Sequence, residues 1–136
     1  MKNFTSSEKA ATELATKSTW IRRSAQELME EWADLTDAGE KIRVKTSLQT
    51  LDHEYDYRDL YLTAGEKELK YDSGYGWRDV DSGRHFTDAL NMPDLRMFLG
   101  ELPLLVAQIQ EKIVATIDKN DEVIGFLATI IGNKKK

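Results

Sequence analysis

The chain contains no cysteine among its 136 residues. This excludes disulfide bonds, thiolate nucleophiles, iron–sulfur clusters and cysteine-ligated zinc. Only two histidines are present, His53 and His85, so a histidine-rich metal site would need both. The motifs HExxH, GxGxxG and GxSxG and a Walker-type glycine loop are absent as well. We therefore expect no metal and no cofactor, and a non-catalytic protein is the favoured interpretation.

Long apolar runs and excess positive charge are also lacking. No window approaches the roughly twenty apolar residues that a membrane span needs, and the first residues do not resemble a secretory signal. The net charge is −5 and the pI is about 5.1, which disfavours binding to nucleic-acid phosphates. We expect a cytoplasmic protein that binds neither membranes nor nucleic acids.

The two prolines lie within residues 93–117, the stretch with the strongest helical pattern. Pro93 suits the first turn of a helix, with Asn91 or Met92 at the cap. Pro103 lies in the interior, where its ring opposes a regular helix, so we expect a bend near residues 100–102. One helical face is apolar and carries Leu95, Leu99, Leu102, Val106, Ile109 and Ile113.

A long helix is predicted at the N-terminus. The Thr5 to Glu8 pattern matches a capping box, and Gly39 supplies a stop. Between them, apolar and small residues alternate at intervals of three and four. This seam either packs inside the molecule or joins two copies in a homodimer. The residues assigned to a dimer seam are Ile21, Ala25, Leu28 and Trp32.

The middle of the chain has the two-residue period of β-strands. Ile42, Val44, Thr46 and Leu48 alternate with polar residues. Further short apolar stretches separated by glycine turns predict an antiparallel meander of four or five strands. The expected strands cover residues 42–48, 57–63, 67–72, 77–80 and 84–87.

The last segment has two interpretations. Asn120 can cap a final helix that ends at Gly132, or residues 113–117 and 123–131 can form a hairpin. In both cases the segment should be buried, in its own core or against a second copy. The predicted fold is one α+β domain over residues 1–136. It has a long N-terminal helix, the meander, a bent C-terminal helix and a second apolar helix or hairpin.

The candidate partner-binding surface lies in an acidic and aromatic part of the predicted sheet, which attracts a basic protein. Its residues are Asp52, Glu54, Asp56, Tyr55, Tyr57, Tyr71, Tyr75 and Trp77. We expect a protein-interaction module: a small acidic adaptor, a chaperone-like protein or an inhibitor-like protein. The alternative is a small metal- or ligand-dependent enzyme that uses His53 or His85 with nearby carboxylates.

Overall fold

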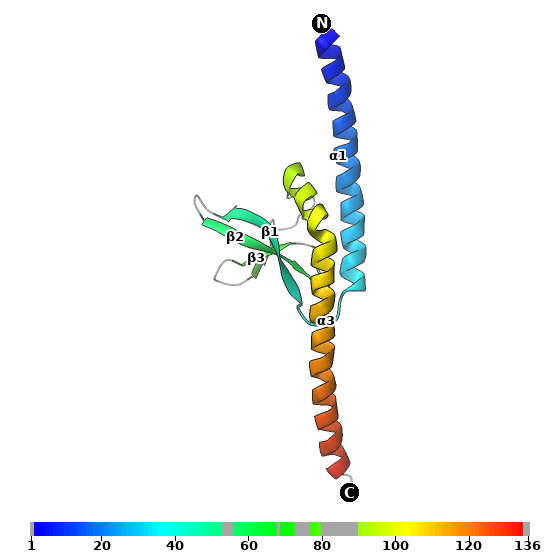
Figure 1. Ribbon diagram of the computed structural model, residues 1–136, viewed down its shortest axis with the longest axis vertical. Helices are drawn as coiled ribbons and strands as arrows, with labels where there is room; N and C mark the ends of the chain where they lie inside the picture. The colour runs from blue at the N-terminus through cyan, green and yellow to red at the C-terminus, as the bar shows by residue number, and fades with distance from the viewer. Residues whose placement is uncertain (1, 53–55, 68, 73–76, 80–89, 135–136) are drawn as a thin grey trace.

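The computed structural model describes residues 2–52, 56–67, 69–72, 77–79 and 90–134 (Figure 1). Its elements are the helix α1 (Lys2–Leu35), the strands β1 (Arg43–Asp52), β2 (Asp56–Thr63), β3 (Lys70–Asp72) and β4 (Trp77–Asp79), and the helix α3 (Met92–Lys134). Both helices run in the same direction and are displaced along it, so α1 extends past the sheet at one end and α3 at the other (Figure 1).

The predicted fold class was wrong. Two helices of 34 and 43 residues dominate the described chain. The described strands pair antiparallel in the order β1-β2-β3-β4, but β3 and β4 have three residues each. Only β1 and β2 have ordinary strand lengths, so the sheet is essentially one hairpin instead of a meander of four or five full strands. The protein is helical with a small sheet attached.

The prediction of a second apolar helix or hairpin was also wrong, because α3 continues without a break to Lys134. Residues 118–122 suggested an interruption, but none of them is proline or glycine. Aspartate and asparagine cost at most about 0.7 kcal/mol each inside a helix, and glycine about 1 kcal/mol at Gly125. These costs are too small to end a helix. Pro103 is likewise inside α3, and the first part of α3 leans away from the axis of the rest (Figure 1).

The predicted end of α1 and the predicted start of α3 are confirmed, whereas the predicted start of α1 is not. The backbone N–H of Asp94 donates to Oδ1 of Asn91 at 2.9 Å, which confirms Asn91 as the cap of α3. Helix α1 ends at Leu35, and Gly39 follows with a φ of 74°. The start at Thr5 was wrong, because α1 already begins at Lys2. No proline or glycine precedes Thr5 to stop the helix from extending.

The core lies where the last half of α1 and the first half of α3 meet the hairpin. Ala25 and Met29 come from α1, whereas Leu60 and Leu62 come from β2. The β2–β3 turn is fixed to the end of α1, because the N–H of Gly65 donates to Oγ1 of Thr36 at 2.7 Å. We call this part of the molecule the body: residues 21–35 of α1, the sheet, and α3 as far as Ile113.

Phe98 tests the helix–sheet packing, because its side chain is fully buried while the neighbouring Met97 is 50% exposed. We expect Phe98→Ala to lower the free energy of unfolding by about 3 to 5 kcal/mol, through lost burial and the cavity left behind. Urea unfolding followed by circular dichroism measures this. Met97→Ala is the control and should change it by less than about 0.5 kcal/mol. Equal effects of the two variants would contradict the packing.

Candidate interaction surface on two helix arms

The first part of α1 projects beyond the body. We call residues 4–20 the N-arm. All of its side chains are exposed except Ser18, which is half-buried. Its large apolar residues are among them: Phe4, Leu14 and, at 69% exposure, Trp20. Phe4, Ala11, Leu14 and Ser18 keep the spacing of the apolar seam that continues into the body. The N-arm therefore presents a stripe that nothing in the described residues covers.

The last part of α3 projects in the opposite direction (Figure 1). We call residues 114–133 the C-arm. Only Thr116 and Ile130 are half-buried there, and the other side chains are exposed. Ile124, for example, is 61% exposed. The large exposed apolar residues of the C-arm are Val114, Ile117, Val123, Ile124, Phe126, Leu127 and Ile131. The prediction that this segment lies in the chain's own core was wrong.

The seam of the C-arm can be traced in the sequence. Ile117, Asn120, Ile124, Leu127 and Ile131 follow one another at intervals of three, four, three and four. They continue the face of α3 that ends in the body with Ile113, which packs against the core. Sequence reasoning missed this seam, because residues 118–122 were interpreted as a break. The unbroken three-four spacing was the signal that could have revealed it.

The residues predicted for a dimer seam lie mostly within the body. Ala25 is buried in the core, and Ile21 and Trp32 pack against it. Leu28 is exposed. The intramolecular interpretation therefore accounts for the three that contact the core. The part of the seam that stays uncovered lies nearer the N-terminus, in the N-arm.

The acidic and aromatic residues predicted to bind a partner follow the two hairpins. In the backbone register Asp52 pairs with Asp56, and Leu51 pairs with Tyr57. Tyr71 pairs with Arg78, and Trp77 pairs with Asp72. Glu54, Tyr55 and Tyr75 lie outside the described residues, as do His53 and His85. A role of this surface in binding a partner stays a prediction.

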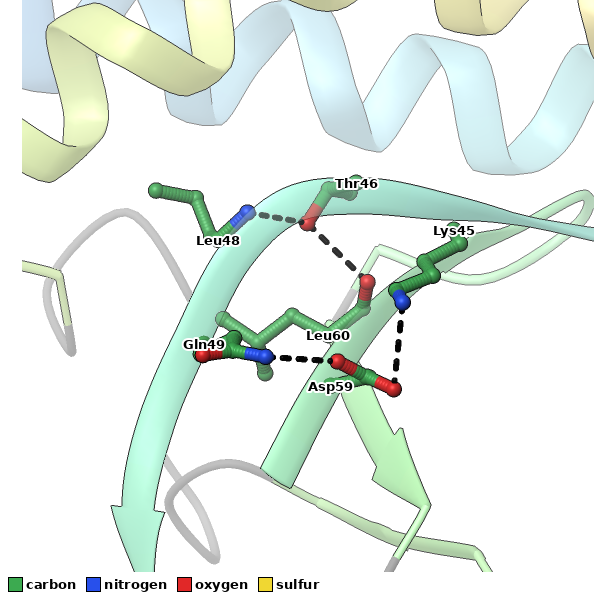
Figure 2. A network of polar contacts seen from close by, with 6 residues as sticks. All are labelled: Lys45, Thr46, Leu48, Gln49, Asp59 and Leu60. Carbon is green, nitrogen blue, oxygen red and sulfur yellow. Dashed lines mark hydrogen bonds and ion pairs between the residues drawn. The ribbon is translucent and has the colours of Figure 1, made fainter. Parts of the chain in front are cut away.

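The register of the β1–β2 hairpin shifts between Lys45 and Gln49. At this shift the side chain of Thr46 hydrogen-bonds to backbone groups of both strands. Its Oγ1 donates to the carbonyl of Leu60 at 3.0 Å and accepts from the N–H of Leu48 at 3.1 Å (Figure 2). Thr46 is buried, so neither backbone group reaches water easily. The hydroxyl therefore holds the irregularity in β1 together.

Two contacts fix α3 to this strand. The N–H of Ser47, within the irregularity, donates to Oε2 of Glu101 at 3.0 Å. Nζ of Lys112 donates to the carbonyl of Arg43 at 2.7 Å, near the start of β1. The guanidinium of Arg43 also lies 4.8 Å from the centre of the Tyr61 ring, a cation–π distance. Together these contacts mark the stretch of α3 that the sheet supports.

Asp59 of β2 follows the predicted partner-binding residues Asp56 and Tyr57 in the sequence, and its side chain is described. Nε2 of Gln49 donates to its Oδ1 at 3.0 Å, and Nζ of Lys45 lies 3.4 Å from its Oδ2 (Figure 2). The Gln49 hydrogen bond, followed by Lys45, lowers the pKa of Asp59 below its usual 3.8, although partial burial opposes this. Its carboxylate is therefore engaged across the hairpin.

A metal site, a pocket and a membrane span each place requirements on the described residues. Its residues contain no cluster of three or more histidine or acidic side chains that could hold a metal ion. One surface hollow is lined by α1 alone, from Ala15 to Arg23, and another by α3 alone, from Ala107 to Val114. None of the described helices is both long and apolar enough to cross a membrane. A cytoplasmic location stays a prediction.

No protein-family model, curated protein or solved structure matches this chain. The functional argument therefore depends on the geometry of the arms and the hairpin.

Thr46→Val tests the hydroxyl in the hairpin. Valine keeps the shape but leaves the Leu60 carbonyl and the Leu48 N–H without their partner, and we expect a loss of about 1 to 3 kcal/mol in the free energy of unfolding. Urea unfolding monitors the change. Thr46→Ser retains the hydroxyl and should be milder. A valine variant as stable as the wild type would show that the hydrogen bonds contribute nothing.

Asp59 predicts a pH dependence. Since its pKa is lowered in the folded state, its contribution to stability is present above the ordinary value of 3.8 and is lost as the pH falls through the lower, folded value. Asp59→Asn should lower the free energy of unfolding at pH 7 by less than about 1 kcal/mol, because the pair is partly exposed. The difference from wild type should vanish in acid.

An NMR titration of the Asp59 carboxyl provides the direct measurement. Gln49→Ala and Lys45→Ala each remove a group that lowers the pKa of Asp59, so each should raise it. An unchanged pKa in either variant would contradict the assignment of that cause.

Proposed function

We propose that this chain is a non-catalytic protein-interaction module whose binding surface is the apolar seam of its two arms. The observation that carries the proposal is the exposure of six large apolar side chains at seam positions that nothing in the described chain covers: Phe4, Leu14, Ile117, Ile124, Leu127 and Ile131. Contiguous apolar surface of this kind is typical of protein interfaces, whereas single exposed apolar residues are ordinary.

The stability of the arms supports the proposal. The arms extend helices that are already formed in the body, so they need no new nucleation, but they lack the tertiary packing that supplies most helix stability in proteins. Fully burying one large apolar side chain contributes about 1.5 to 3 kcal/mol. Several such side chains on each arm are enough to offset the roughly 4 to 15 kcal/mol that association costs. A partner would therefore stabilise the arms as well as bind them.

The charges within the C-arm favour a protein partner over a lipid surface, although Lys134, Lys135 and Lys136 follow it directly in the sequence. Its polar face carries Asp118, Lys119, Asp121 and Glu122, three acids and one base. Helices that lie on membranes usually have a basic polar face, which is attracted to anionic lipids. The specific role, as a small acidic adaptor, a chaperone-like protein or an inhibitor-like protein, belongs to the same proposal, and so does a basic partner for the acidic hairpin.

Photo-crosslinking tests the module. Benzoylphenylalanine at position 124 places the reactive group on the seam, and the purified protein is irradiated in lysate of its source cells. We expect one discrete adduct, identified by mass spectrometry, because either a second copy of the chain or a different protein on the seam would lie within reach of the reactive group. The matched control carries the same group at position 122, on the polar face of the same arm, and should give little of this adduct. Absence of a discrete adduct at position 124 would refute the proposed function.

A further inference from the structure

Building on this function, we propose that the partner of the arms is a second copy of the chain. The N-arm of each copy packs antiparallel against the C-arm of the other, with Ser18 opposite Asn120. The resulting dimer is closed, because it covers all four arms.

The positions of the two arms are the first observation in favour of the dimer. They project from opposite ends of the body and belong to helices that run in the same direction (Figure 1). The N-arm and the C-arm are similar in length, about 25 Å and 30 Å at 1.5 Å per residue. A two-fold axis perpendicular to the helices brings each N-arm beside the partner's C-arm, in antiparallel orientation, at both ends at once. Such an arrangement is isologous and closes at two copies.

The exposed surface of the single chain fits this assembly. The molecule exposes 9786 Å² of accessible surface. A compact monomer of 15.6 kDa exposes about 7,200 Å², so this chain exposes roughly a third more. Obligate homodimers bury from about 2,000 Å² to more than 5,000 Å² in total. The excess surface of two chains is of the same order, so a dimer that covers the arms would account for it.

The seams of the two arms match layer by layer in one antiparallel register. Both follow the three-four spacing, and with Ser18 opposite Asn120 the seam positions from Ser7 to Ser18 face those from Asn120 to Ile131. The layers are Ser18 with Asn120, Leu14 with Ile124, Ala11 with Leu127, and Ser7 with Ile131. Small residues of the N-arm at positions 7 and 11 face large residues of the C-arm, a combination that lets side chains interdigitate.

Asn120 selects the register, because it is the polar residue in an otherwise apolar C-arm seam. A polar residue in a seam is costly unless it finds a hydrogen-bonding partner, and it can thereby specify register. Shifting the arms by one heptad in either direction places Asn120 opposite Ala25, which is buried in its own core, or opposite Ala11. Only the Ser18 hydroxyl offers a polar partner among these three registers.

The main competitor is a parallel, head-to-tail arrangement. There the N-arm of one copy lies along the C-arm of the next, and Ser7 faces Asn120. Repeating this contact leaves one unpaired arm at each end, so the assembly grows as an open filament. The antiparallel dimer leaves no arm unpaired, and the dipoles of its paired helices point in opposite directions. Ser7 and Ser18 lie about 16 Å apart along α1, so crosslinking distinguishes the two arrangements.

Because the chain has no cysteine, paired cysteine variants provide the test. Purified Ser18→Cys/Asn120→Cys should give a covalent species of twice the chain mass with a short thiol-to-thiol crosslinker, without a ladder of larger species. Ser7→Cys/Asn120→Cys is the matched control and should react several-fold less. A ladder from the control variant would overturn the antiparallel register, and a covalent dimer from Asn120→Cys alone would show C-arms paired with each other.

Light scattering on variants without cysteine checks the dimer independently. The wild type should have twice the chain mass, and Ile124→Asp should weaken dimerisation at least tenfold, whereas Glu122→Gln on the polar face should not. Circular dichroism of Ile124→Asp should retain the unfolding transition of the body, which separates dissociation from misfolding. A monomeric wild type would refute the second copy as partner. If position 124 still gave a discrete adduct with a different protein, the interaction module would stand.

Discussion

The structure depends on one constraint: the apolar face of α3 is about twice as long as the sheet that can cover it. Helix α3 has 43 residues and extends about 64 Å, whereas the ten residues of β1 extend about 33 Å. The apolar seam of α3 therefore runs from a half of the helix that the sheet covers into a half that it does not cover. Leu105 and Ile109 are buried in the first, whereas Ile117 and Ile124 are exposed in the second. The change occurs near Ile113 without a change in amino-acid type.

Polar contacts determine which half of α3 is covered. Glu101 binds the N–H of Ser47, and Lys112 binds the carbonyl of Arg43, so the helix is held at two points along β1. Thr46 stabilises the irregular part of β1 that presents the Ser47 N–H. Sliding α3 along the sheet to cover its exposed end would break these bonds and remove Leu95 and Phe98 from the core. The exposed C-arm is thus a consequence of how the hairpin and α3 fit together.

Local patterns predicted much of this structure, and the failures have a common cause. The Asn91 cap, the end of α1 before Gly39 and the strand around Val44 depend on neighbouring residues only, and all three were predicted correctly. Whether residues 123–131 are covered depends instead on the length of the body, which no local pattern encodes. The break expected at residues 118–122 gave too much weight to polar residues whose helical cost is a fraction of a kcal/mol each. The position of the candidate surface could therefore not be predicted, although its seam was present in the sequence.

The same seam has different requirements inside and outside the body. In the body, burial against the sheet fixes the position of each side chain, so apolar residues suffice and Ala25 can approach closely. Outside it, an all-apolar stripe could pair in several registers, since a shift by one heptad again places apolar residues opposite apolar residues. Asn120 penalises every pairing that gives its amide no partner, by about 1 to 3 kcal/mol per buried group. A polar residue in an exposed seam therefore reduces promiscuous association, and this role requires that the C-arm be an interface.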